Sequence, residues 1–142
     1  MFVFRMLGIA RDVFDTTGAA LYPGRWHSAG TRIVYAAEHA SLAVLETLLH
    51  AGGRKLPPRV LVRIEIPDKV SVEISGWLEM PYSQAFGDLW MREKRSAVLR
   101  VPSIAVNKVE SNFLFNPSHP EFAKIRHDPP RAFAFDPRFF TI

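Results

Sequence analysis

Residues 31–53 read TRIVYAAEHASLAVLETLLHAGG and contain the clearest change of structural pattern in the chain. The first seven of them, 31–37, are rich in β-branched and aromatic side chains, which predicts a strand. A helix should follow, because Ser41 is a suitable N-cap and leucines then recur at helical spacing. The two glycines that close the stretch should end this helix. A strand that leads directly into a helix indicates a fold of mixed class.

The leucines of this helix are expected to define its buried face. Leu42, Leu45 and Leu49 fall on one side of a helical wheel drawn at 100° per residue. Glu46 lies at the edge of that apolar stripe, next to Leu42. We therefore expect its carboxylate to be half sheltered by packing. It is either a boundary residue that points outward or a charge presented into a cleft.

Short strand signals and loop signals alternate along the rest of the chain. The expected strands are 2–7, 59–67, 70–74, 97–101, 112–115 and an edge strand within 131–140; a second helix is expected over 83–94, and a glycine-rich loop with at most one helical turn over 8–30. Many short strands with two real helices predict an α+β fold with a mostly antiparallel sheet. The chain shows no linker or repeat, so we expect one domain over residues 1–142.

Composition excludes several classes of protein. The 142 residues are 48% apolar and 23% charged, as in globular proteins, and none is cysteine, which excludes a disulfide scaffold, a thiol nucleophile and an iron–sulfur cluster. The net charge of +4 fits an anionic ligand or partner without implying nucleic acid. No stretch approaches the ~20 apolar residues of a membrane span, and the N-terminal apolar run is too short for a signal peptide. We expect a soluble, cytoplasmic protein.

Four residues offer chemistry suited to a dinucleotide. Arg25 lies on a glycine-rich turn and Arg5 in the first strand, and arginine binds phosphate through a bidentate fork. Tyr35 supplies a flat ring for stacking and a hydroxyl. A half-buried Glu46 could stabilise positive charge that develops on a sugar. These residues could hold a dinucleotide and break an N-glycosidic bond, although their spacing alone does not bring them together.

Other catalytic patterns are missing from the sequence. It has no phosphate-binding loop and no nucleophile elbow. The five histidines show no metal-ligand spacing, so we expect no bound metal and interpret them as surface or loop residues.

Several motifs together resemble one family. They are GRWHSAG at 24–30, VYAA at 34–37, LAVLE at 42–46, LRVPS at 99–103, ESN at 110–112 and NPSH at 116–119. In this order they resemble the RES domain, which is named for an Arg, a Glu and a Ser. Carried over by position, Arg25, Glu46 and Ser103 match those three residues. Tyr35 matches the tyrosine between them and Arg5 an early arginine, while Ser96 is a rival for the serine.

The resemblance implies a fold and an activity. RES domains are similar to ADP-ribosyltransferases of the diphtheria-toxin type, which have a split β-sheet. They are the toxins of RES–Xre toxin–antitoxin pairs and consume NAD⁺ as substrate, by hydrolysis or phosphorolysis; at least one kind transfers ADP-ribose to a protein. The implied partner is an Xre-type antitoxin with a helix-turn-helix domain. It would block the active site and cover exposed apolar surface. Part of the same surface could instead form a homodimer.

The resemblance also suggests a role for each residue. Glu46 would favour positive charge at the anomeric carbon of the ribose, and Arg25 and Arg5 would grip the pyrophosphate or the adjacent ribose. Tyr35 would stack on the nicotinamide. Ser103 would hydrogen-bond to the ribose or orient Glu46.

A different class of function remains open at this point. The basic run 92–100 permits a nucleic-acid-binding or RNA-cleaving toxin. The cationic residues are scattered, however, and no histidine pair supports ribonuclease chemistry. We expect the basic run to be a solvated helix face, with docking of an acidic antitoxin tail or a phosphate as the alternative. We expect Trp77 and Trp90 to lie in the core.

Overall fold

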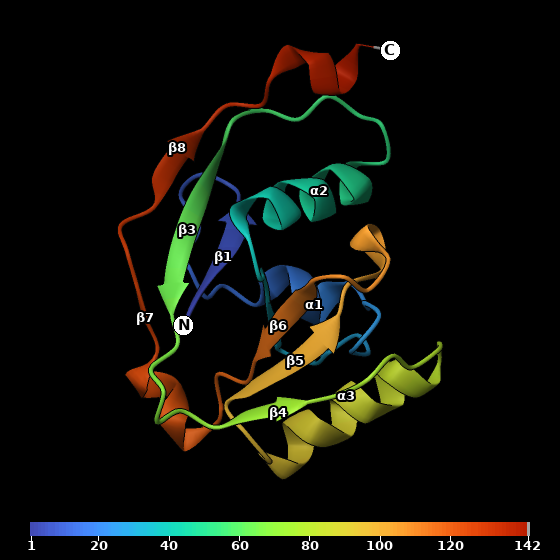
Figure 1. Ribbon diagram of the computed structural model, residues 1–142, viewed down its shortest axis with the longest axis vertical. Helices are drawn as coiled ribbons and strands as arrows, with labels where there is room; N and C mark the ends of the chain where they lie inside the picture. The colour runs from blue at the N-terminus through green and yellow to red at the C-terminus, as the bar shows by residue number, and fades with distance from the viewer. Residues whose placement is uncertain (142) are drawn as a thin grey trace.

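The computed structural model describes residues 1–141 and shows a twisted eight-stranded sheet with helices against it (Figure 1). The strands are β1 (Phe2–Leu7), β2 (Val34–Ala37), β3 (Arg59–Glu65), β4 (Val72–Ile74), β5 (Val98–Pro102), β6 (Ser111–Phe115), β7 (Arg126–His127) and β8 (Arg131–Phe133). The helices are α1 (Thr17–Leu21), α2 (Ala40–Ala51) and α3 (Tyr82–Glu93), with 3₁₀ turns η1 (Ile104–Val106), η2 (Pro120–Lys124) and η3 (Pro137–Phe140). This confirms the predicted α+β class.

The sheet is split between two of its central strands. Its order is β4-β5-β6-β2-β1-β3-β7, with β8 also paired to β3. β1 pairs with β3 over six residue pairs, but it meets β2 in register only where Phe4 faces Ala37. The sheet therefore opens into two halves, as the resemblance implied. All pairings except that of β4 with β5 are antiparallel, which confirms the predicted sheet type.

Both long helices cover the same face of the sheet. Asn112 and Leu114 lie two residues apart on β6, so they share a face, and Asn112 pairs with Ala37 of β2. Leu42 of α2 packs against Ala37, and Trp90 of α3 packs against Leu114. Figure 1 shows the two helices with η1 between them. The opposite face holds the larger core cluster.

The boundaries of α2 differ slightly from the prediction. Its N-cap is His39, which makes no side-chain capping bond, whereas Ser41 lies inside the first turn. The predicted end is confirmed, because Gly52 adopts a left-handed conformation with φ of 60° and donates its N–H to the carbonyl of Leu49. Only glycine adopts that conformation without a steric penalty, which explains a stop at this position.

The predicted buried face of α2 was wrong. Leu42 is fully buried, but Leu45 and Leu49 are 40% and 62% exposed. The other buried residues of the helix are Ala43, Val44 and Ala51, of which Ala43 clusters with Leu42 and with Ala37 of β2. α2 carries apolar residues on more than one side, so its periodicity does not reveal which side packs. This rotation leaves Glu46 half-buried at the inner edge of the helix.

Other sequence-based expectations were closer to the structure. The loop over 8–30 contains one short helix, α1, as predicted, and Trp90 lies fully buried in the core. The strand predicted over 31–37 begins only at Val34, and the tail forms the short strand β8 before η3. Among the residues that the structure describes, no helix is long and apolar enough to cross a membrane.

Candidate active site

A carboxylate held by two donors lies between α2 and the sheet. Ser103 Oγ and Asn112 Nδ2 both donate to Glu46 Oε1, at 2.9 and 3.0 Å. Within residues 1–141, no donor reaches Glu46 Oε2 within hydrogen-bond distance. The carboxylate is therefore fixed in orientation through one oxygen, while the other oxygen remains available to a bound molecule.

The serine that contacts Glu46 is Ser103. It is fully buried and directly follows β5, and its backbone N–H donates to the carbonyl of Glu110. The rival Ser96 is engaged elsewhere, because its Oγ accepts from Trp90 Nε1 and donates to the carbonyl of Val98. The geometry thus supports Ser103 as the serine of the site.

Asn112 is a site residue to which sequence reasoning assigned no role. It was noticed only as the last residue of the ESN motif at 110–112. Its place on β6 opposite Ala37 puts it on the face that α2 covers, within reach of Glu46. The only hint in the sequence is that Asn112 is a polar residue next to the apolar run 113–115. That hint does not identify Glu46, 66 residues away, as its partner.

Tyr35 is bonded to a buried histidine. Its hydroxyl lies 2.6 Å from His27 Nδ1, while His27 Nε2 lies 2.9 Å from the carbonyls of Ala19 and Tyr22. Carbonyls only accept, so Nε2 carries the proton and Nδ1 accepts from Tyr35. Burial raises the pKa of Tyr35 far above its usual value, which keeps it a neutral donor. His27 was interpreted as a surface or loop residue; it does lie in the loop between α1 and β2, but it is only 3% exposed and therefore not on the surface.

The loop that carries Arg25 is fastened to α3. Ser83 Oγ donates to the carbonyl of Arg25 at 2.7 Å, and Gln84 Nε2 donates to the carbonyl of Gly24 at 3.0 Å. Glycine is required at position 24, because a Cβ there would lie 2.9 Å from the hydroxyl oxygen of Tyr35. These hydrogen bonds to backbone carbonyls position the loop at Arg25. They do not use the Arg25 side chain.

Asp88 of α3 holds the other end of the same loop. Its carboxylate accepts from the backbone N–H of Ser28 at 2.9 Å, from the Ser28 hydroxyl, and from Thr31 Oγ1 at 3.0 Å. Burial alone would raise the pKa of Asp88, but these hydrogen bonds to the charged form outweigh it and lower the pKa below its ordinary value. Asp88 is therefore ionised at neutral pH and anchors the loop.

The Arg25 side chain lies over an indole ring. Its guanidinium carbon is 4.8 Å from the centre of Trp77, and Lys108 Nζ is 4.9 Å from the same centre. Trp77 is only half-buried, so the prediction that it belongs to the core was wrong. It lies between β4 and α3, where its Nε1 donates to Glu79. A single tryptophan in a loop gives no sequence signal that separates a core residue from a surface platform.

Arg5 lies apart from these residues. It shares its side of β1 with Val3 and Leu7, which belong to the core cluster on the opposite face of the sheet. Its guanidinium donates to the backbone carbonyls of Tyr35 and Asp15, each at 3.0 Å. Burial lowers its pKa to about 10. These contacts favour a structural role over the expected grip on pyrophosphate.

Three groups near the start of α2 could in principle ligate a metal. Ligand atoms of Glu38, His39 and Glu110 lie within 4.8 Å of one another. They already have partners, since Glu38 accepts from Arg100 and the N–H of Ser111, and His39 pairs with Glu110 at 2.9 Å. The hydrogen bond to the Glu110 carboxylate raises the pKa of His39. The group is an ion-pair network in this structure.

Two of the four cations in the basic run 92–100 are paired with carboxylates. Arg95 pairs with Glu73 and Glu93, and Arg100 pairs with Glu38. Arg92 and Lys94 are exposed, as expected of a solvated face. Arg95 and Arg100 differ from that expectation, because Glu73 of β4, Glu93 of α3 and Glu38 lie within reach. This pairing also weakens the nucleic-acid alternative, which needs uncompensated cations along one surface.

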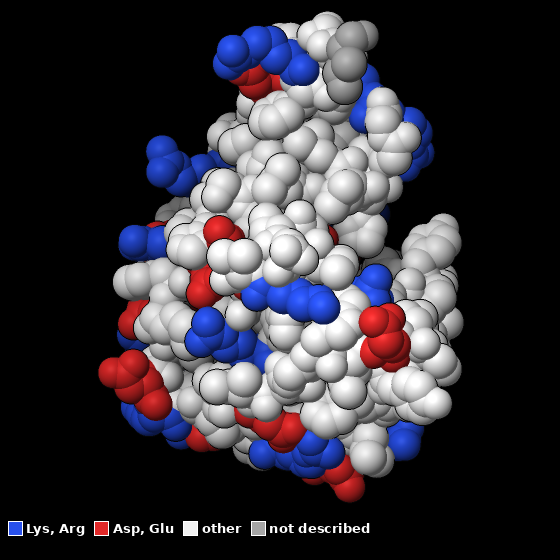
Figure 2. Space-filling view, turned by 45° about the vertical axis from the view of Figure 1, so that its right-hand side comes forward, with Lys and Arg blue, Asp and Glu red and all other residues white. Residues whose placement is uncertain are grey.

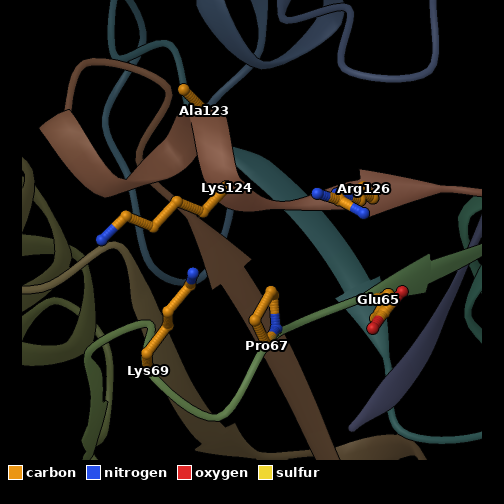
Figure 3. Close-up of a pocket in the computed structure, with 6 residues that line it drawn as sticks. All are labelled: Glu65, Pro67, Lys69, Ala123, Lys124 and Arg126. Atoms are coloured by element: carbon orange, nitrogen blue, oxygen red, sulfur yellow. The ribbon is translucent and has the colours of Figure 1, made fainter.

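A separate hollow lies at the β3–β7 end of the sheet. It is lined by Glu65, Pro67, Lys69, Ala123, Lys124 and Arg126. Figure 3 shows Lys69 and Lys124 extending toward the same opening. None of these residues belongs to the group around Glu46, whose partners come from the other half of the sheet.

Comparison with known proteins places the chain in a family. The family model described as the RES domain matches residues 3–136. The chain belongs to the RES domain family. A RES relative from Sphingobium sp. (strain YBL2), named "Prs ADP-ribosylating toxin", is 40% identical over 89% of this chain and 86% of its own. Another, "Toxin Res" of Pseudomonas putida (strain KT2440), is 37% identical over 74% of this chain and 78% of its own.

A solved structure shares the fold of this RES domain. It is the crystal structure of the M. tuberculosis MbcT–MbcA toxin–antitoxin complex. The TM-score is 0.75 at 15% sequence identity, covering 98% of this chain and 86% of that one. At such low identity the match supports the fold only, which agrees with the α+β RES architecture described above.

Proposed function

We propose that this RES domain is the toxin of a toxin–antitoxin pair and that it cleaves the nicotinamide–ribose bond of NAD⁺. The observation that carries the proposal is the Glu46 carboxylate, held at Oε1 by Ser103 and Asn112 with Oε2 left for a substrate. The names of the relatives, both toxins and one an ADP-ribosylating toxin, support it.

The chemistry needs a positioned negative charge and little else from the protein. Nicotinamide is a cationic leaving group, so the electron pair of the broken bond leaves with its ring nitrogen and the base departs neutral. The ribose carbon passes through an oxocarbenium-like state, as in glycoside cleavage. Glu46 Oε2 would stabilise that cation and hydrogen-bond to a ribose hydroxyl. An acceptor nucleophile then forms the new bond at the same carbon.

The contacts described above form a continuous path around the expected site. Glu46 binds Ser103 and Asn112, and the backbone N–H of Lys108 donates to the Ser103 carbonyl. The Lys108 ammonium and the Arg25 guanidinium each make a cation–π contact with the Trp77 ring. The glycine before Arg25 packs against Tyr35, whose strand β2 pairs with the strand of Asn112. This arrangement supports assigning Arg25, Tyr35, Glu46 and Ser103 to one active site.

The acceptor of ADP-ribose has three candidates: water, phosphate and a protein side chain. The 40% identical relative is named for ADP-ribosylation of Prs, and this favours a protein acceptor as the second candidate activity. Release of free nicotinamide from NAD⁺ alone would indicate hydrolysis. Transfer of label from adenine-labelled NAD⁺ to purified Prs protein would indicate the transferase, and a requirement for phosphate would indicate phosphorolysis.

An antitoxin partner, of Xre type as the family resemblance implies, would cover exposed apolar residues around Glu46. Leu45 and Leu49 of α2, Ile104 of η1 and Val109 in the following turn are all at least 40% exposed. Figure 2 shows an uncharged area in the middle of the upper half of this side of the molecule, with basic residues at its top, left and right edges, and such an area suits a protein cover. The fold neighbour is a toxin in complex with its antitoxin, which supports such a partner. A homodimer through the same surface is the competing occupant, and the mass of the purified chain in solution distinguishes them.

The test follows nicotinamide release from NAD⁺ by the purified chain. We expect Glu46→Gln to lower the rate about 10²–10³-fold, the usual loss for one preorganised electrostatic contact. The control is Glu65→Gln, an exposed carboxylate of β3, which should retain the wild-type rate. Circular dichroism should show both variants folded. Wild-type activity in Glu46→Gln would overturn the site assignment, and no release or transfer under any condition would return the RNA-cleavage alternative to consideration.

A further inference from the structure

Two cations from different loops lie over one indole ring. The Arg25 guanidinium carbon and Lys108 Nζ lie 4.8 and 4.9 Å from the centre of Trp77. Each therefore gains a cation–π contact from the same ring. Because both are close to one point, the two charges lie within about 10 Å of each other, no more than a Debye length at moderate salt.

Neither cation is paired with a carboxylate of the described residues. Arg63, Arg95 and Arg100 each pair with a carboxylate at 3.3 Å or less. Within residues 1–141, by contrast, no carboxylate oxygen lies within 4.0 Å of the Arg25 guanidinium or the Lys108 ammonium, and neither side chain donates a hydrogen bond. Two like charges held this close repel, so a bound anion that bridges them would be stabilised by both.

Lys108 lies in the turn that follows Ser103, one of the two residues that donate to Glu46. Asn107 and Lys108 have φ values of 53° and 65°, consecutive left-handed conformations that non-glycine residues seldom adopt. The turn closes where the N–H of Lys108 donates to the carbonyl of Ser103 at 2.7 Å. Ser103 in turn donates to Glu46. The backbone of Lys108 is thereby tied to Ser103, the serine that donates to the carboxylate proposed to act on the ribose.

We propose that Arg25 and Lys108 together bind the diphosphate bridge of the dinucleotide, with Trp77 as the positioning residue that holds both cations toward it. This rests on the proposed function and deepens it. In NAD⁺ the diphosphate is attached through one methylene to the ribose that loses nicotinamide, so an anion site that includes Lys108, whose backbone N–H donates to Ser103, matches the substrate. Lys108 thus takes the second-cation role that the sequence suggested for Arg5.

The test measures binding of ADP, which contains the diphosphate but no nicotinamide ribose, by calorimetry on the purified chain. Lys108→Met should weaken ADP binding about tenfold, the loss expected for one charge-assisted contact. Lys55→Met is the matched control, because Lys55 is exposed and its change of charge is the same. Adenosine, which lacks phosphate, should bind Lys108→Met and wild type equally.

Trp77 variants separate positioning from packing. Trp77→Ala should weaken ADP binding and flatten its dependence on salt, whereas Trp77→Phe keeps a cation–π face and should restore part of the affinity. In NAD⁺ turnover, Lys108→Met should raise KM more than it lowers kcat. Equal folding of the variants is checked by thermal unfolding.

The outcomes separate this proposal from the proposed function. Wild-type affinity for ADP in Lys108→Met, an equal loss in Lys55→Met, or no ADP binding by the wild type would each overturn the diphosphate site. ADP binding that depends on Lys108, in a chain that releases no nicotinamide and transfers no label, would support the anion site and overturn NAD⁺ cleavage. Cleavage of NAD⁺ with an unchanged KM in Lys108→Met would support the proposed function and overturn the diphosphate site.

Discussion

At the scale of single residues, the Tyr35 hydroxyl forms a hydrogen bond with a buried partner. It donates to His27 Nδ1, and the histidine is 3% exposed. Tyr35→Phe would leave that nitrogen as a buried acceptor without a donor. We expect the free energy of unfolding to fall by about 1–3 kcal/mol, measured by urea denaturation. Tyr82→Phe, whose ring is 72% exposed, is the control and should change little. Equal stability of the two variants would contradict a stabilising hydrogen bond between Tyr35 and His27.

The identity of single residues was readable from the sequence where a motif marked it. Arg25, Glu46 and Ser103 were chosen from the motifs, and the structure joins the last two through one hydrogen bond. Asn112 received no role because its partner lies on a distant helix. Spacing describes neighbours along the chain, whereas the hydrogen bond from Asn112 to Glu46 depends on which strand faces which helix.

At the scale of elements, α3 serves as the support of the Arg25 loop. The contact is closest at Gly87, where an added Cβ would lie 1.7 Å from the carbonyl oxygen of Trp26. Gly87→Ala must therefore push the helix away from the loop. We expect a loss of stability of about 1–3 kcal/mol or more and reduced NAD⁺ cleavage, measured by thermal unfolding and nicotinamide release.

Gly18→Ala is the control for that prediction. Gly18 lies in α1, and a Cβ there meets nothing within 4 Å. Because alanine favours the helix by roughly 0.5–1 kcal/mol over glycine, this variant should be as stable as the wild type or slightly more so. If Gly87→Ala behaved like Gly18→Ala, the close approach of α3 to the loop would be refuted.

At the scale of the whole molecule, Arg5 bridges the split in the sheet. β1 and β2 share one pair in register, and beyond it the Arg5 guanidinium donates to the Tyr35 carbonyl of β2 and to the Asp15 carbonyl. Arg5→Met would leave these carbonyls without their donor. We expect a loss of about 1–3 kcal/mol for each carbonyl that stays buried and faster amide exchange along β2.

The matching control is Arg11→Met, because Arg11 is exposed and, among residues 1–141, pairs only with nearby Asp15. An exposed pair contributes at most about 1 kcal/mol, so this variant should remain close to wild type. The KM for NAD⁺ should be unchanged in Arg5→Met at temperatures where it stays folded. A raised KM with unchanged stability would instead restore Arg5 to the substrate site, as the resemblance suggested.

The sequence by itself determined the class of fold, the places of α2 and α3, and the RES motifs that carry Arg25, Glu46 and Ser103. These follow from local patterns, because periodicity, turn residues and motif letters act over a few neighbouring positions. Only the tertiary structure decided that α2 turns Leu45 and Leu49 outward and that Trp77 leaves the core to carry two cations. Those outcomes depend on which surfaces meet across the split sheet, and contacts between residues far apart in sequence are settled by packing of the whole chain.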